Sequence, residues 1–165
     1  SRTRSHAVPG EGDPNARILL LGEAPGKKED LSGKPFVGRA GSYLNRALWE
    51  HGLSRGQLYI TSILKCFDPK PPRKQDIETC LPWTICQLGR ISPELVLIMG
   101  RQAERGLFGK SSLGAAVEVR HWDGRVCVIT CHPAAAMRFP NRHRQFRRGM
   151  DLLTWIARER KILPL

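Results

Sequence analysis

Two short segments combine special backbone residues with side chains that could bind or polarise a ligand. In Gly22-Glu-Ala-Pro-Gly26 the two glycines let backbone approach a flat or anionic ligand, and Pro25 stiffens the turn. In His132-Pro-Ala-Ala-Ala-Met-Arg138 the histidine could donate a hydrogen bond to a developing anion, or act as an acid or base. Taken alone, each segment is better explained as a tight turn or a packed histidine.

The first segment does not have the pattern of a nucleotide site. It lacks the glycine spacing of dinucleotide-binding folds and the Gly-Lys-Ser/Thr ending of a phosphate-binding loop. We therefore expect no nucleotide cofactor. The charge points instead to a polyanionic partner, because 27 Lys and Arg face 15 acidic residues, for a net charge of +12. Such a field attracts nucleic acid, although it also favours non-specific contacts.

Apolar runs and helical patterns alternate along the chain. Short apolar or β-branched runs predict strands at 16–21, 58–64, 95–99, 117–120 and 126–129, the last two joined by a turn at Asp123-Gly124. Apolar residues at helical spacing predict helices at 37–52, 76–91 and from 100 to 107. Pro82 either kinks the second helix or marks its first turn.

A last helix is expected to follow the second of the two segments. Asn141 can cap it, and its apolar face comprises Phe146, Met150, Leu153 and either Ile156 or Trp155. The alternation predicts a single α/β domain over residues 1–165, with an irregular lead-in over 1–15. We expect a three-layer α/β/α sandwich with a central, mostly parallel four-stranded sheet. Ligands of such sheets bind beyond the carboxyl ends of the strands, where both segments lie.

The cysteines and the start of the chain give further expectations. The five cysteines are odd in number and no secretion signal opens the sequence, which argues against a disulfide scaffold and predicts a cytoplasmic location. No run approaches the roughly 18 apolar residues that span a membrane. Because Ser1 is not an initiator Met, we expect a trimmed or processed chain.

Several ordered motifs resemble those of the family 4 uracil-DNA glycosylases, the iron–sulfur type. The segment 22–26, then Glu29-Asp30 and Gly33-Lys-Pro-Phe-Val-Gly-Arg-Ala-Gly41, resembles the first motif of that family. Tyr59-Ile-Thr-Ser-Ile-Leu-Lys-Cys66 looks like its second strand, and 132–138 resembles its second catalytic motif. The likeness runs from about Val8 to the last helix.

The resemblance implies a monofunctional uracil-DNA glycosylase involved in DNA repair. Such an enzyme flips uracil out of DNA, hydrolyses its N-glycosidic bond and leaves an abasic site. The chemistry needs no metal, and a monomer suits it. The alternative is a binder of uracil or abasic DNA that is inactive or weakly active, which Ser62 and the missing cysteines allow.

The resemblance also implies roles for individual residues. His132 would hydrogen-bond uracil O2, and Phe36 would stack on the flipped ring. Because Ala24 stands where the best-known glycosylases carry Asp, Glu23 or Glu29 would assist the water. Ser62 stands where many relatives carry an Asn that reads uracil, which leaves selectivity to backbone groups or water and admits other deaminated bases. The implied base pocket comprises Gly22, Glu23, Ala24, Pro25, Gly26, Phe36, Ser62 and His132.

The family pattern places DNA contacts and a cluster as well. Met137 and Arg138 stand where a wedge enters beside the flipped base, and nearby arginines would contact phosphates, namely Arg142, Arg144, Arg147 and Arg148. Cys66 and Cys80 match two of the four ligands of a 4Fe–4S cluster. The upstream Cys pair is absent, so either the chain is truncated before it, which we favour, or the cluster is lost.

Overall fold

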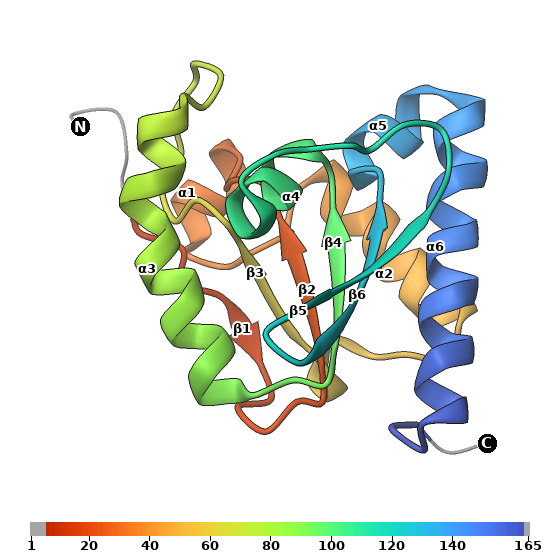
Figure 1. The fold of residues 1–165 in the computed structure, drawn as a ribbon. Helices are drawn as coiled ribbons and strands as arrows, with labels where there is room; N and C mark the ends of the chain where they lie inside the picture. Colours follow the sequence, from red (N-terminus) through yellow and green to blue (C-terminus); the bar gives the residue numbers. More distant parts are fainter. Residues whose placement is uncertain (1–5, 164–165) are drawn as a thin grey trace.

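The computed structural model describes residues 6–163, which form one sheet with helices on both faces (Figure 1). The strands are β1 (Glu11–Gly12), β2 (Ile18–Gly22), β3 (Tyr59–Ser62), β4 (Leu95–Met99), β5 (Glu118–Trp122) and β6 (Arg125–Thr130). The α-helices are α1 (Lys27–Ser32), α2 (Arg39–Glu50), α3 (Lys74–Ile91), α4 (Arg101–Phe108), α5 (Pro133–Arg138) and α6 (Pro140–Glu159), and η1 (Arg55–Gln57) is a 3₁₀ turn. Within these residues no helix is long and apolar enough to span a membrane.

The sheet has the order β1-β3-β2-β4-β6-β5. Its four inner strands are parallel, whereas β1 and β5 pair antiparallel at the two edges. The predicted α/β sandwich is confirmed, but the prediction of four strands is wrong by these two edge strands. β1 comprises only two residues of the predicted irregular lead-in, too short to carry a sequence pattern. β5 leads into β6 through the tight turn at Asp123-Gly124, where both residues have positive φ, and the two strands pair antiparallel.

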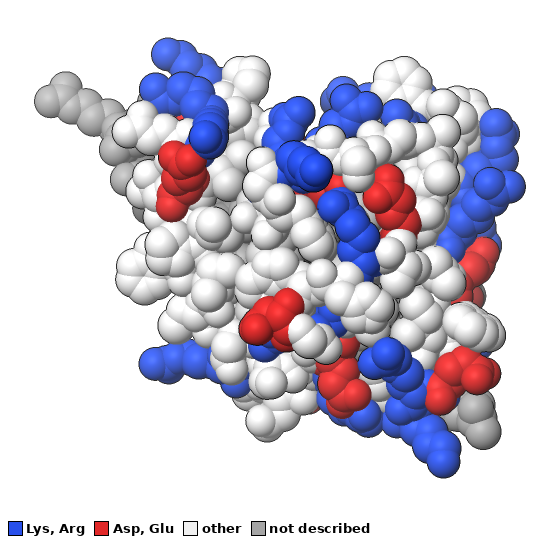
Figure 2. Space-filling view, viewed as in Figure 1, with Lys and Arg blue, Asp and Glu red and all other residues white. Residues whose placement is uncertain are grey.

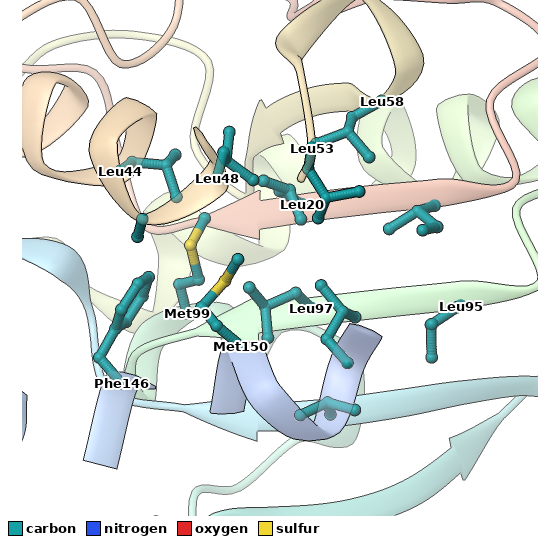
Figure 3. Close-up of a cluster of buried hydrophobic side chains, with 14 of the residues drawn as sticks. Leu20, Leu44, Leu48, Leu53, Leu58, Leu95, Leu97, Met99, Phe146 and Met150 are labelled. Carbon is teal, nitrogen blue, oxygen red and sulfur yellow. The ribbon is translucent and has the colours of Figure 1, made fainter. Parts of the chain in front are cut away.

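The parallel strands are buried on both faces, which explains their continuous apolar sequences. Leu20 and Leu97 point to the face covered by α2 and α6 (Figure 3), where Leu44, Phe146 and Met150 complete the core. Leu19 and Ile98 point to the opposite face, beneath α3 and α4. The carboxyl ends of β2, β4 and β6 reach the same edge, which carries α4 and α5 (Figure 1).

Several helix boundaries differ from the predictions. α6 begins at Pro140 with Phe139 at the N-cap, so the predicted Asn141 cap is wrong. Proline suits this first position because its missing N–H would find no partner inside the helix. α3 runs through Pro82, which excludes the interpretation of that residue as a first turn. Ile156 belongs to the buried face of α6, and Trp155 is exposed.

Two six-residue helices, α1 and α5, were not predicted at all. α1 directly follows the first polar segment, after β2, whereas α5 comprises residues 133–138 of the second segment, after β6. Six residues are too few to show a 3.6-residue apolar period, so the sequence pattern predicted neither helix. These helices determine where the residues of the polar segments point.

A buried carboxylate ties α4 to the long connection before β5. Glu104 is completely buried and accepts hydrogen bonds from Ser112 N (3.0 Å) and Leu113 N (3.2 Å), and it pairs with Arg120. Further along this connection, the carbonyl of Gly114 accepts a hydrogen bond from Arg142 of α6. The network therefore holds the connection in place across the edge of the sheet that carries α4 and α5.

Glu104→Ala should lower the free energy of unfolding by about 3 kcal/mol, because Arg120 and two backbone N–H groups lose a buried partner. The matched control is Glu94→Ala, which removes a carboxylate from an ion pair with Arg17 whose side chains are 46% and 47% exposed. That change should cost less than about 1 kcal/mol. Urea unfolding followed by circular dichroism measures both, and equal losses would contradict the assigned network.

Candidate active site

The two polar segments meet across a pocket at the carboxyl edge of the sheet. The pocket has a volume of about 240 Å³. Its lining comes from the loop after β2, the turn before α2, the end of β3 and the start of α5: Val8, Ala24, Pro25, Gly26, Glu29, Pro35, Phe36, Gly38, Arg39, Ala40, Ser62, His132 and Ala134. The parallel topology thus brings together residues that lie more than a hundred positions apart.

His132 stands at the end of β6 and caps α5. Its Nδ1 accepts a hydrogen bond from Ala134 N at 3.1 Å, so in the neutral ring the proton resides on Nε2. Burial lowers the pKa of His132 to about 4, and the nearby Glu29 carboxylate opposes that shift only in part. The side chain is therefore neutral at physiological pH and presents an Nε2–H donor.

Phe36 provides a flat apolar wall beside this donor. Its ring is buried and lies 5.8 Å from the His132 ring, centroid to centroid, with 26° between the planes. The ring packs so closely on the end of β2 that a Cβ on Gly22 would lie 2.5 Å from its Cζ. Gly22 is therefore required by the ring, and both residues belong to the same wall of the pocket.

Ser62 ends β3 directly beside Gly22 in the parallel register. It is buried, and its hydroxyl lies 3.3 Å from where a Cβ on Gly22 would stand. No hydrogen bond from this hydroxyl occurs within residues 6–163, so it is available to a ligand in the pocket. One hydroxyl can donate once and accept in another direction, which suits the edge of a pyrimidine.

The two candidate carboxylates occupy different positions. Glu29 belongs to α1 and lines the pocket, where its Oε1 accepts hydrogen bonds from Val37 N (3.0 Å) and Gly38 N (2.9 Å). Glu23 lies outside the base pocket, in adjoining hollows that also contact His132. Burial raises the pKa of Glu23, which makes its carboxylate a readier proton acceptor than an exposed one.

The residues expected to contact DNA differ in how they are engaged by the rest of the protein. Met137, Arg138 and Arg144 are exposed near the α5–α6 junction. Arg142 donates hydrogen bonds to Gly114 O and Gln145 Oε1, and Arg147 pairs with Glu50. These two arginines therefore also hold protein segments together. Arg148 is exposed on α6.

The structure adds residues that the sequence pattern missed. Arg101, Gln102 and Arg105 of α4 line hollows next to His132, and Phe139 is 56% exposed at the α5–α6 junction. Figure 2 shows Lys and Arg gathered along this edge, over the start of α3, α4 and α5. A sequence signal for these α4 residues does exist. They directly follow the predicted strand at 95–99, and ligands of parallel sheets bind where such strands end.

The cysteines do not complete a cluster site among the described residues. Cys66 and Cys80 are both half-buried, whereas Cys127 and Cys131 are buried in the core beside the sheet. Within residues 6–163 no group of three or more His, Cys, Asp or Glu side chains could hold a metal ion. A 4Fe–4S cluster needs four thiolates, so these residues do not fit one and we derive no chemical step through it.

The fold and this edge define an α/β protein with a pocket at the carboxyl ends of its parallel strands and basic side chains beside it. Comparison with known proteins gives the family. The model of the uracil DNA glycosylase superfamily matches residues 9–153. Similar relatives are type-4 uracil-DNA glycosylases from Pyrobaculum aerophilum (38% identical, covering 90% of this chain and 82% of the relative) and Archaeoglobus fulgidus (37%, 88% and 79%). One from Sulfurisphaera tokodaii is 38% identical and covers 84% and 69%.

The chain therefore belongs to the uracil DNA glycosylase superfamily, and within it to the type-4 uracil-DNA glycosylases. This confirms the resemblance inferred from the motifs. The matched region contains all four walls of the pocket, from the loop after β2 to the start of α5.

The depressed pKa of His132 predicts a specific dependence of stability on pH. The unfolded chain binds a proton at His132 below about pH 6.5, but the folded chain resists it down to about pH 4. His132 therefore leaves the free energy of unfolding unaffected above pH 6.5 and lowers it by about 1.4 kcal/mol for each pH unit of acidification between those values. Urea unfolding of the protein and of His132→Gln should show that slope only in the parent protein, and equal slopes would contradict the assignment.

Proposed function

We propose that this protein hydrolyses the N-glycosidic bond between uracil and deoxyribose in DNA, leaving an abasic site. The observation that carries the proposal is the neutral His132, whose Nε2–H is free to point at a base lying against Phe36. Membership of the type-4 family supports the substrate, since the relatives are named as uracil-DNA glycosylases.

In the proposed reaction the target nucleotide leaves the helix and its base enters the pocket. The ring stacks on Phe36, an interaction worth about 1–3 kcal/mol per base. As the bond from C1′ to N1 breaks, the electron pair moves into the uracil and negative charge grows on O2. The Nε2–H of His132 stabilises that charge inside a site shielded from solvent, where a neutral donor needs no proton transfer of its own.

The sugar side of the reaction requires stabilisation of a developing cation and delivery of water. Glu29 is held by two backbone N–H groups beside the pocket, and we propose that it acts by its negative charge. Glu23 has a raised pKa and lies next to His132, and we propose that it orients the water and accepts one of its protons. Water oxygen then bonds to C1′, and the departing uracil takes a proton from solvent at N1.

Base selection in this proposal depends on the short Ser62 side chain. Its hydroxyl can make one hydrogen bond to the edge of uracil that carries N3–H and O4, whereas the amide of an Asn would make two. A single hydroxyl can reorient to suit a different edge, so we expect hypoxanthine or xanthine to be accepted in part.

The surroundings of the pocket support DNA as the substrate. The basic edge supplies phosphate contacts, with Met137 and Phe139 exposed beside it to fill the space left by the flipped nucleotide. The proposed enzyme works as a monomer, since one chain supplies every wall of the pocket. Cys66 and Cys80 as cluster ligands remain a prediction, and no step of the proposed reaction depends on them.

His132→Ala should slow uracil excision about 100- to 1,000-fold, as expected for the loss of a donor to a developing oxyanion. Single-turnover cleavage of a uracil oligonucleotide, with alkali to break the abasic product, measures this. Binding to the same DNA should persist, because the basic edge is unchanged. An unaltered rate in the variant would disprove the role of His132. If the parent protein bound uracil DNA tightly but released no abasic product, the alternative of an inactive DNA binder would be correct.

Ser62→Ala should lower uracil excision about tenfold, since the base edge loses its side-chain partner. Ser62→Asn should raise the preference for uracil over hypoxanthine, because a two-point contact rejects bases that cannot match it. Excision rates on matched oligonucleotides carrying either base measure that ratio. Identical ratios for the parent and the Asn variant would show that Ser62 does not read the base.

A further inference from the structure

The turn that carries Phe36 is held by an arginine that lies outside the pocket. Arg55 of η1 donates a hydrogen bond to Pro35 O at 2.6 Å and another to Phe36 O at 3.1 Å. A third, to Asn45 Oδ1 at 3.1 Å, anchors the guanidinium on α2. Arg55 lies 19 positions beyond Phe36 in sequence and does not line the pocket. It also pairs with Glu11 at 3.9 Å, and it reaches the Phe36 turn through backbone carbonyls.

This backbone is in a conformation that needs support. Phe36 has φ = 50°, a left-handed value that is costly for a bulky aromatic residue and persists only when its surroundings impose it. Glu29 holds the following residues through Val37 N and Gly38 N, and Arg55 holds the carbonyls on the other side. Gly41 admits the close approach, because a Cβ there would lie 1.9 Å from Phe36 O.

Arg55 also connects the two walls that a base would touch. Its turn, η1, leads through the buried Leu58 directly into β3, which ends at Ser62. The guanidinium therefore spans from the segment that carries the hydroxyl to the turn that carries the ring. Both residues line the pocket, so a displacement of the Arg55 guanidinium would move the Phe36 ring relative to Ser62.

The chemistry of these contacts explains why an arginine stands here. Its planar fork can donate to two neighbouring carbonyl oxygens at once, which a lysine ammonium does with less fixed geometry. The guanidinium is partly buried against these oxygens, and this burial lowers the pKa of Arg55, while Glu11 opposes the shift. The guanidinium nevertheless remains charged, because arginine is not deprotonated in proteins.

We infer that Arg55 is a positioning residue that sets the Phe36 ring and the Ser62 hydroxyl at the spacing needed to hold a flipped base. The inference rests on the proposed function, because it presumes that the pocket receives a base from DNA. A positioning role differs from a general contribution to stability. The effect of Arg55 on base binding should act through the Phe36 ring, so it should be absent when that ring is removed.

The experiment measures how much the base adds to DNA binding. The probes are an oligonucleotide with one 2′-fluoro-2′-deoxyuridine, whose glycosidic bond resists hydrolysis, and the same oligonucleotide with a tetrahydrofuran abasic site. The ratio of the two affinities isolates the contribution of the base, because phosphate contacts are common to both probes. The variants are Arg55→Met, Arg55→Lys, Phe36→Leu and the Arg55→Met/Phe36→Leu double variant.

Arg46→Met is the matched control. It removes the same charge from the neighbouring helix α2, where the Arg46 side chain is 81% exposed and, within residues 6–163, pairs only with Glu50. We expect Arg55→Met to reduce the affinity ratio about tenfold, Arg55→Lys to lie between it and the parent, and the control to stay within about twofold. In the Phe36→Leu background, Arg55→Met should cause no further loss.

An unchanged ratio in Arg55→Met, or independent losses that multiply in the double variant, would overturn the inference. No preference for the uridine probe in the parent protein would also overturn it, because the pocket would not receive a base. Thermal unfolding checks each variant, and Arg55→Lys serves if Arg55→Met does not fold. Uracil excision is assayed separately. A parent protein that prefers the uridine probe but excises no uracil would refute only the glycosylase proposal, and the inference would still be decided by the affinity ratios.

Discussion

The parallel pairing of β2 with β3 is the constraint on which the pocket depends. It places Gly22 beside Ser62, and the backbone bond from Ile63 N to Gly22 O (2.9 Å) maintains the pairing where the strands end. With no side chain at Gly22, the Phe36 ring can lie against the strand and face the base. A shift of one residue in this register would turn Ser62 away from the pocket and place a side chain in the ring's position.

Burial and charge have different roles at the site. The protein has a net charge of +12, and its basic side chains gather at the edge where the pocket opens. A positively charged His132 would add to that field, but it would enter the site at a large desolvation cost. Burial keeps the ring neutral instead, and the hydrogen bond from Ala134 N determines which nitrogen carries the proton. In the proposed mechanism, separate groups therefore attract DNA and stabilise the transition state.

The two carboxylates illustrate how a residue near a reaction can serve structure and chemistry together. Glu29 organises the turn that holds Phe36 through two backbone N–H groups, and its charge also acts on His132. Glu23 has no such structural bonds from its carboxylate among the described residues, and its raised pKa comes from burial. In the proposed mechanism Ala24 needs no acidic side chain, because Glu23 and Glu29 supply the negative charge.

The sequence by itself determined the layered α/β class, the inner parallel strands and the two polar segments, because these depend on local apolar patterns and on chain order. The family followed from the motifs for the same reason. The pattern also predicted a strand at the position of β5, but not that β5 joins the sheet as an antiparallel edge. It could not reveal β1, the six-residue helices α1 and α5, or the α6 start at Pro140, since each is too short or is decided by its neighbours. Only the three-dimensional structure decided the tautomer of His132, because it depends on how the backbone at the start of α5 turns its N–H groups toward the ring. The structure also decided the bonds of Glu29 and Arg55 to the Phe36 turn, because hydrogen bonds between separate segments exist only after folding has brought them together.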